Sequence, residues 1–169
     1  YNTFMLKNKI LSFILFFIIT FSASFIGGAV SINLKEPWYS TLIKSSLNPP
    51  DWVFAPVWTI LYFMMTIAVW NFWHSKNRDM NTIYIYFIHI IINTTWSIVF
   101  FALHKIFLAM LVLITLIIFI FLLIIRFKSV NKLSYYLMIP YLLWCFYALF
   151  LNINSVSYTH LRAHETRFY

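Results

Sequence analysis

The sequence predicts an all-α integral membrane protein, a bundle of five transmembrane helices with a structured loop between the first two. The chain of 169 residues is 63% hydrophobic and only 9% charged, whereas soluble domains contain about 25% charged residues. It also contains five apolar runs of about 20 residues, each long enough as a helix to cross a hydrocarbon layer of about 30 Å. Within lipid, only a helix satisfies its own backbone hydrogen bonds inside a single segment.

The five apolar runs set the expected bounds of the helices: Ile10–Ile32, Val53–Trp73, Thr82–Leu103, Ile106–Ile125 and Leu133–Ile153. The first run has an alternative interpretation, because Lys7 and Lys9 precede it and small residues follow at 22–24, as in a signal peptide. Its apolar character continues through Val30, which favours a spanning helix.

A single domain is expected over residues 5–156. Residues 1–4 are interpreted as upstream read-through, because Met5 followed by basic residues is a more natural start. The abruptly polar segment 157–169 is interpreted as a non-native tail, which we exclude from functional reasoning.

The net charge of +8 comes from basic residues scattered over short loops, which argues against a nucleic-acid partner. Membrane proteins carry an excess of Lys and Arg in their cytoplasmic loops. Seven such residues fall on one side of the predicted bundle, so we expect the N-terminus on the cytoplasmic side of a bacterial cell membrane. The seven are Lys7, Lys9, Lys76, Arg78, Arg126, Lys128 and Lys132.

Residues for classical catalysis are missing from the pattern. We find no nucleophile–base pair, phosphate-binding loop or metal-spaced Cys/His cluster. No acidic residue falls within an apolar run, and the single cysteine, Cys145, excludes an internal disulfide. The sequence therefore predicts no metal site and no required cofactor.

An aromatic and proline-rich segment, residues 38–62, is the most distinctive part of the chain. Three tryptophans, two tyrosines and three prolines fall within these 25 residues. Each buried indole N–H needs a partner, and each proline removes a backbone donor. Because a plain spanning helix needs none of these residues, the segment indicates the mouth of a pocket.

Three helix faces are expected to converge on that pocket. Residues spaced by three or four positions share one face of a helix, and a polar stripe inside a membrane helix faces the bundle interior. An apolar pocket with a few polar groups is the usual form of a small-molecule site. The faces are Phe54, Trp58 and Tyr62; His89, Asn93 and Trp96; and Trp144, Ala148 and Asn152.

Each of these residues also has a structural interpretation. Trp58 and Trp144 could form part of an interfacial aromatic belt. Asn93 and Asn152 could link helices by hydrogen bonds. His89 could be a haem axial ligand, but a lone membrane histidine is more often bonded to a neighbour.

The motifs of this chain resemble those of the tryptophan-rich sensory proteins, also called translocator proteins or peripheral-type benzodiazepine receptors. The resemblance rests on W-Y-x-x-L-x-K at 38–44, P-P-x-W-V-F-x-P-V-W-T-x-L-Y-x-x-M at 49–65, N-x-x-W-S-x-x-F-F at 93–101 and P-Y-L-x-W at 140–144. It covers roughly residues 10–156. Ser45, Thr66 and His89 depart from the family pattern, in which proline, glycine and often glutamine stand at these positions.

The resemblance implies a membrane receptor or carrier that binds tetrapyrroles, such as protoporphyrin IX or haem-like molecules, with sterol-like lipids as further candidates. It implies a role in porphyrin transport or sensing, a homodimer, and porphyrin as ligand rather than cofactor. Membrane lipids are the other expected partners. The predicted ligand-binding residues are Tyr39, Trp52, Phe54, Trp58, His89, Asn93, Trp96, Trp144, Ala148, Leu151 and Asn152.

Two alternatives stay open. Family members are associated with light-dependent porphyrin breakdown, which would make Trp58 and Trp144 the catalytic candidates. A scaffold or regulatory partner would instead bind other membrane proteins. Gly27, Gly28 and Ala29 could then mediate association, because small residues let helices approach closely.

Overall fold

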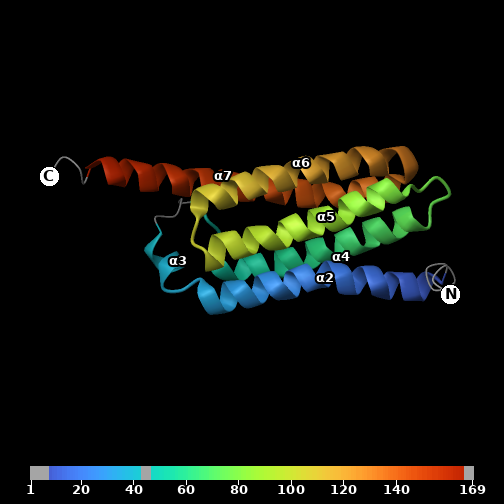
Figure 1. Cartoon of the computed structure of the whole chain (residues 1–169), viewed down its shortest axis with the longest axis horizontal. Coiled ribbons are helices and arrows are strands. Elements are labelled where there is room, and N and C mark those ends of the chain that lie inside the picture. Colours follow the sequence, from blue (N-terminus) through green and yellow to red (C-terminus); the bar gives the residue numbers. More distant parts are fainter. Residues whose placement is uncertain (1–7, 43–46, 166–169) are drawn as a thin grey trace.

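Five long helices dominate the computed structural model, which describes residues 8–42 and 47–165, with side chains described up to residue 156. Short elements lie between them: α3 (Trp38–Thr41), the 3₁₀ turn η1 (Asp51–Val53) and the π-helical turn η2 (Ile98–Ala102). In the described part of the chain, five helical segments are long and apolar enough to cross a membrane. The long helices are α2 (Lys9–Leu34), α4 (Phe54–Trp73), α5 (Met80–Ser97), α6 (Ile106–Val130) and α7 (Lys132–Glu165) (Figure 1).

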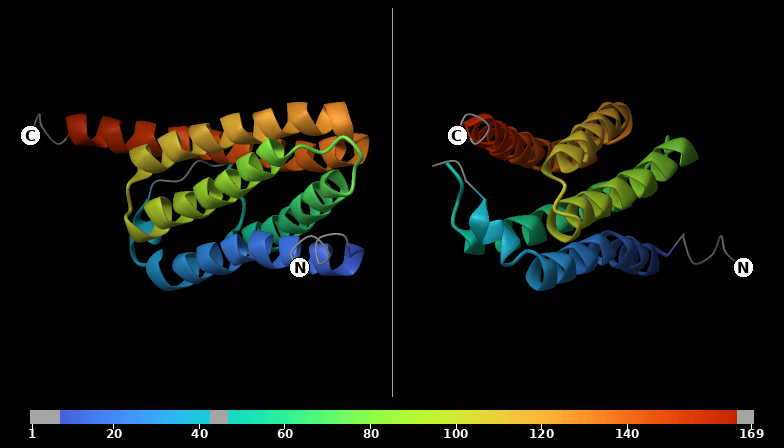
Figure 2. Two further views of the ribbon diagram at one scale, coloured as in Figure 1. Left: turned by 45° about the vertical axis from the view of Figure 1, so that its right-hand side comes forward. Right: turned by 60° about the vertical axis from the view of Figure 1, so that its left-hand side comes forward.

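The long helices form a closed ring whose order differs from the chain order. α2 packs against α4 and α5, α4 packs against α7, and α6 lies between α5 and α7. The views in Figure 2 show this arrangement, with α6 and α7 together on the side away from α2. α4 and α5 are consecutive in the chain, yet each has its main neighbours elsewhere.

Side-chain caps explain where several helices begin. Asn8 accepts hydrogen bonds from the N–H groups of Ile10 and Leu11 at the start of α2, and Asp79 accepts from Thr82 N at the start of α5. Asn131 accepts from Ser134 N in the first turn of α7. Each cap satisfies a backbone donor that the helix itself leaves unpaired.

Aromatic rings and a few buried hydroxyls fill the ring of helices. Phe72 of α4 and Phe127 of α6 meet across its centre, with ring centroids 5.0 Å apart. Thr20 of α2 and Tyr86 of α5 share a hydrogen bond of 2.6 Å, and Ser134 of α7 donates to the Ala68 carbonyl of α4 at 2.6 Å. The half of the bundle around Phe72 and Phe127 is therefore solidly packed.

The turn η2 interrupts what the sequence predicts as one helix over Thr82–Leu103. Leu103 N donates to Ile98 O, five residues back, at 3.0 Å, and His104 has a positive φ of 54°. Apolar periodicity does not distinguish α from π hydrogen bonding, so this turn could not be predicted from the sequence. Such π-turns are frequent at functional sites.

The last two helices are longer than expected. α6 continues past Ile125 to Val130, because Arg126 and Lys128 can extend along the helix surface toward water. α7 continues past Ile153 to Glu165 and projects beyond the other helices (Figure 1). The expected polar tail from residue 157 thus begins inside a helix.

Candidate ligand cavity

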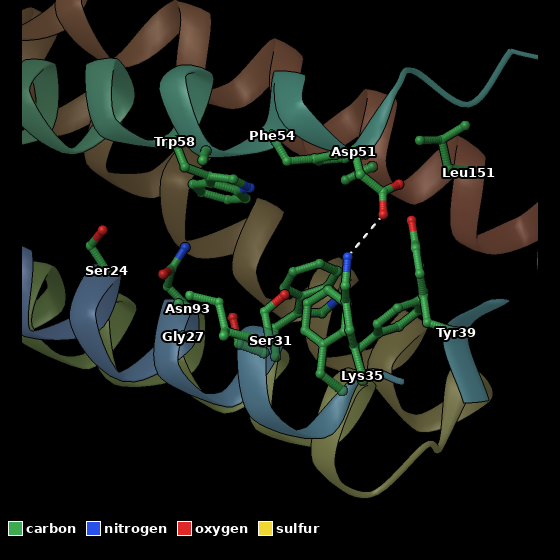
Figure 3. Close-up of a pocket in the computed structure, with 18 of the residues that line it drawn as sticks. Ser24, Gly27, Ser31, Lys35, Tyr39, Asp51, Phe54, Trp58, Asn93 and Leu151 are labelled. Carbon is green, nitrogen blue, oxygen red and sulfur yellow. Dashed lines mark hydrogen bonds and ion pairs between the residues drawn. The ribbon is translucent and has the colours of Figure 1, made fainter. Parts of the chain in front are cut away.

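A cavity of about 380 Å³ lies at the end of the bundle where α2 ends and α4 begins. Residues of α2, α3, η1, α4, α5, η2 and α7 line it, and among the described residues none comes from α6. Figure 3 shows its two sides, with Ser24, Gly27 and Ser31 of α2 facing Phe54 and Trp58 of α4. Its volume falls within the range of about 300–1,000 Å³ that is usual for small-molecule sites.

One wall of the cavity is aromatic. The ring centroid of Trp58 lies 6.5 Å from that of Trp96, and Trp96 stacks on Phe100 at 5.5 Å with an interplanar angle of 20°. Phe54 and Phe101 also line the cavity. Because η2 follows α5 directly, the π-turn carries two successive rings, Phe100 and Phe101, to the same cavity.

The opposite wall is made of small residues of α2. Ser24, Gly27, Gly28 and Ser31 all line the cavity. A Cβ at Gly27 would lie 2.9 Å from Ser97 Oγ and 3.3 Å from Ser97 Cβ, so the absence of a side chain at Gly27 leaves room for Ser97 of α5. Gly27 is thus in contact with α5 within the chain, and association through Gly27, Gly28 and Ala29 stays a prediction.

The floor of the cavity is polar, and its side chains are hydrogen-bonded to one another. Tyr62 donates to Asn93 Oδ1 at 2.6 Å, and Asn93 Nδ2 donates to the Tyr141 hydroxyl at 2.9 Å. Tyr62 and Asn93 line the cavity, whereas Tyr141 lies behind them with no exposed surface. These bonds link three helices, so the floor is held in a fixed geometry.

A single ion pair stands at the mouth in the described part of the chain. Lys35 Nζ lies 2.8 Å from Asp51 Oδ2 and 5.1 Å from the centroid of the Tyr39 ring (Figure 3). The hydrogen bond to Asp51 raises the pKa of Lys35 above its ordinary value. Burial raises the pKa of Tyr39, and the Asp51 carboxylate adds to this shift. The mouth therefore presents a permanent cation beside a neutral phenol.

Eight of the eleven predicted ligand-binding residues line this cavity. They are Tyr39, Phe54, Trp58, Asn93, Trp96, Ala148, Leu151 and Asn152. The structure thus brings together residues from a loop and three helices that lie up to 113 positions apart in the sequence, from 39 to 152.

The other three predicted residues lie outside the cavity lining. Trp52 is 74% exposed on η1, because its side chain points away from the bundle. His89 lies one turn deeper than Asn93 and is fully buried. Trp144 lies one turn deeper than Ala148 and packs edge-on against Phe54, with centroids 6.0 Å apart. Residues that share a helix face point toward the same side of the bundle. Their spacing does not tell how far the cavity extends along that face.

The structure does not favour His89 as a metal ligand, and it shows no other metal site among the described residues. Both ring nitrogens are engaged, Nδ1 with the Tyr86 carbonyl and Nε2 with the Tyr141 hydroxyl, each at 3.1 Å. Within residues 8–42 and 47–156, no three side chains of His, Cys, Asp or Glu gather as metal ligands would. Haem ligation by His89 would require one of its bonds to break.

Sequence reasoning missed the α2 wall and the ion pair. Lys35 and Asp51 are opposite charges near the two ends of the loop, which is a usable signal even though Glu36 follows Lys35 directly. The α2 residues show only a small-residue pattern, which by itself predicts helix association rather than a cavity wall. Lys44, which matches the family motif, and Ser45, which departs from it, lie outside the described residues.

Comparison with known proteins agrees with this architecture. Residues 14–157 match the model of the TspO/MBR family. A tryptophan-rich protein TspO of Chlorobaculum tepidum is 33% identical over 155 residues, which cover 90% of this chain and 98% of the relative.

Two further relatives are similar. Protein CrtK of Rhodobacter capsulatus is 32% identical over 131 residues, covering 76% of this chain and 82% of the relative. A tryptophan-rich sensory protein of Cereibacter sphaeroides is 30% identical over 140 residues, covering 82% and 88%. Together with the five apolar helices, these matches identify a multi-pass membrane protein. The chain belongs to the TspO/MBR family.

Proposed function

We propose that this protein is a membrane receptor or carrier that binds a tetrapyrrole, such as protoporphyrin IX or a haem-like molecule, in the cavity described above, and that it acts in porphyrin transport or sensing. The observation that carries the proposal is an aromatic cavity with its charged groups confined to the mouth. Such a site suits a flat apolar ring that carries acidic groups at one edge.

The walls fit the two parts of such a ligand. A macrocycle can stack on Trp58 and on the Trp96–Phe100 pair, and aromatic contacts of this kind contribute about 0.5–1.5 kcal/mol each beyond area burial. Carboxylates at its edge would lie at the mouth near Lys35, where water also screens them. Sterol-like lipids could use the same apolar walls and have no need of the cation.

The proposal includes the orientation of the protein in the membrane. In a bacterial cell membrane with the N-terminus on the cytoplasmic side, the α2–α4 loop and the cavity mouth face the opposite side. Ligand would then enter from outside the cytoplasm or from the outer leaflet. A homodimer remains a further proposal, for which the exposed apolar surface offers area.

Light-dependent degradation of the ligand is the second candidate. Trp58 supports it, because its indole lines the cavity and would touch a bound macrocycle. Trp144, the other candidate, would act only across the ring of Phe54. If degradation occurs, we therefore expect Trp58 to contribute more than Trp144.

The test is titration of the full chain in detergent with protoporphyrin IX in darkness, followed by tryptophan fluorescence. We expect saturable quenching in the wild type and affinity several-fold weaker in Trp58→Phe, because one stacking surface is reduced. Trp52→Phe is the matched control, since this exposed indole lies outside the cavity lining. Equal affinities in the two variants, or no saturation, would argue against the cavity as the binding site.

Illumination of the same samples separates the two functions. Loss of the porphyrin absorption bands with appearance of a new product, dependent on Trp58, would favour degradation. An unchanged ligand spectrum would favour carriage or sensing.

A further inference from the structure

We propose that His89, buried beneath the cavity floor, is a positioning residue that turns the Tyr62 hydroxyl into a hydrogen-bond acceptor toward the cavity. The cavity would then favour apolar ligands that bring a hydrogen-bond donor to Tyr62. This inference deepens the proposed function and rests on the same cavity, although its central observation is independent of any ligand.

Four hydrogen bonds connect the cavity floor to the backbone of α5. Tyr62 Oη and Asn93 Oδ1 lie 2.6 Å apart, and Asn93 Nδ2 lies 2.9 Å from Tyr141 Oη. Tyr141 Oη is 3.1 Å from His89 Nε2, and His89 Nδ1 is 3.1 Å from the Tyr86 carbonyl oxygen. All five residues belong to α4, α5 and α7, and each is buried.

The Tyr86 carbonyl, at the end of this series of hydrogen bonds, sets the direction of every bond in it. A backbone carbonyl can only accept, so His89 Nδ1 must carry a proton. In a neutral imidazole, Nε2 is then an acceptor, and Tyr141 must donate its proton to it. The Tyr141 oxygen can consequently only accept from Asn93 Nδ2, which leaves Asn93 Oδ1 to accept from Tyr62.

The imidazole is neutral on structural grounds. His89 has no exposed surface and lies in the middle of an apolar helix, where a charge is costly. The two ion pairs among the described residues lie at the ends of the bundle, at Lys35–Asp51 and Asp79–Arg126, so neither supplies a counter-charge.

The consequence for the cavity concerns Tyr62 alone. Its one proton is committed to Asn93, so its oxygen presents only lone pairs to an occupant. If every hydrogen bond in this series ran in the opposite direction, Tyr62 would accept from Asn93, and its O–H would be free to donate into the cavity. The direction of these hydrogen bonds therefore changes the hydrogen-bonding character of the floor with no larger movement than a flip of the Asn93 amide.

The direction itself is tested by nitrogen-15 NMR of the full chain labelled at histidine. We expect the His89 signals, identified by their loss in His89→Gln, to show a neutral ring protonated at Nδ1. His74→Gln provides the control for the assignment. A ring protonated at Nε2, or at both nitrogens, would overturn the proposal whatever the cavity binds.

The effect on selectivity is tested with two flat probes of the same shape. Carbazole carries an N–H donor, whereas dibenzofuran has a ring oxygen that can only accept. We expect the ratio of their affinities to favour carbazole in the wild type by about 2- to 12-fold more than in Tyr62→Phe, the value of one hydrogen bond. His89→Gln should lower the ratio, because a Gln amide can present either end to Tyr141.

The outcomes distinguish this inference from the proposed function. An affinity ratio that is the same in the wild type and in Tyr62→Phe overturns the inference, even if protoporphyrin IX binds. A ratio that depends on Tyr62 upholds it, even if protoporphyrin IX fails to bind and the proposed ligand class is wrong. Failure of both probes to bind saturably also overturns it.

Discussion

Two neighbouring glycines of α2 allow the packing around the cavity to be tested against a control one residue away. A Cβ added at Gly27 would lie 2.9 Å from Ser97 Oγ and 3.3 Å from Ser97 Cβ, whereas one added at Gly28 meets no heavy atom within 4 Å. In a helix, Gly→Ala gains about 1 kcal/mol from propensity at either position. The difference between Gly27→Ala and Gly28→Ala therefore isolates the contact with Ser97.

The magnitude follows from these distances. Carbon atoms pack best at about 3.5–4.0 Å, so the new Cβ requires the Ser97 hydroxyl to rotate away and Ser97 Cβ to shift by a few tenths of an ångström. Overpacking of this kind costs about 1–3 kcal/mol. We expect Gly27→Ala to be less stable than Gly28→Ala by this amount. For a chain of this length, the difference corresponds to a Tm lower by roughly 2–12 °C.

Thermal unfolding in detergent, followed by circular dichroism, measures this difference. Adding Ser97→Ala to Gly27→Ala should restore part of the loss, because it removes the atom at 2.9 Å but keeps the Cβ at 3.3 Å. Equal Tm values for Gly27→Ala and Gly28→Ala would show that α2 and α5 are not in contact at this point.

Three further predictions concern other parts of the molecule. Burial, then the neighbouring cations, lower the pKa of His74, so the unfolded chain binds the proton more readily. Stability should fall as pH drops below about 6.5 and level off once folded His74 is also protonated, and His74→Gln should flatten this dependence in thermal melts. Ser134→Ala, which removes a buried bond between helices, should cost about 0.6–1.7 kcal/mol in thermal melts, whereas Ser129→Ala, at an exposed bond within α6, should change stability by less than about 0.5 kcal/mol. Asp51→Asn should free Lys35 for ligand carboxylates and tighten protoporphyrin IX binding by up to about fivefold in fluorescence titrations, without affecting its dimethyl ester.

Each of these has a result that would count against it. A pH slope that survives in His74→Gln would assign it to another group. Equal losses in Ser134→Ala and Ser129→Ala would remove the contribution of the buried bond between helices. The same gain for the ester as for the acid would mean that Lys35 does not meet the ligand carboxylates.

The spanning helices were predictable because lipid imposes their length and apolar character. All five expected runs coincide with helices, and the differences lie at the ends and at η2. The order of the ring was not predictable, since it depends on contacts between individual side chains such as Phe72 and Phe127. Hydropathy indicates that a helix spans the membrane, but it does not indicate which helices are its neighbours.

The sequence predicts which helix faces point toward the cavity, but not how far the cavity extends along them. The stripe His89–Asn93–Trp96 does face the interior, yet the cavity ends at Asn93, and His89 supports its floor from below. Trp144 is displaced from the lining for the same reason, because Phe54 fills the space in front of it. Depth depends on how far neighbouring rings extend, which helical periodicity does not encode.

The order of the ring also bears on how the protein is made. α4 finds its second neighbour only in α7, the last of the described helices to be synthesised. Until α7 enters the membrane, the side of the cavity formed by Ala148, Leu151 and Asn152 does not exist. A nascent chain that has inserted only α2, α4, α5 and α6 therefore exposes an open groove to lipid. The cavity is therefore closed to the bilayer only once α7 has joined the other helices.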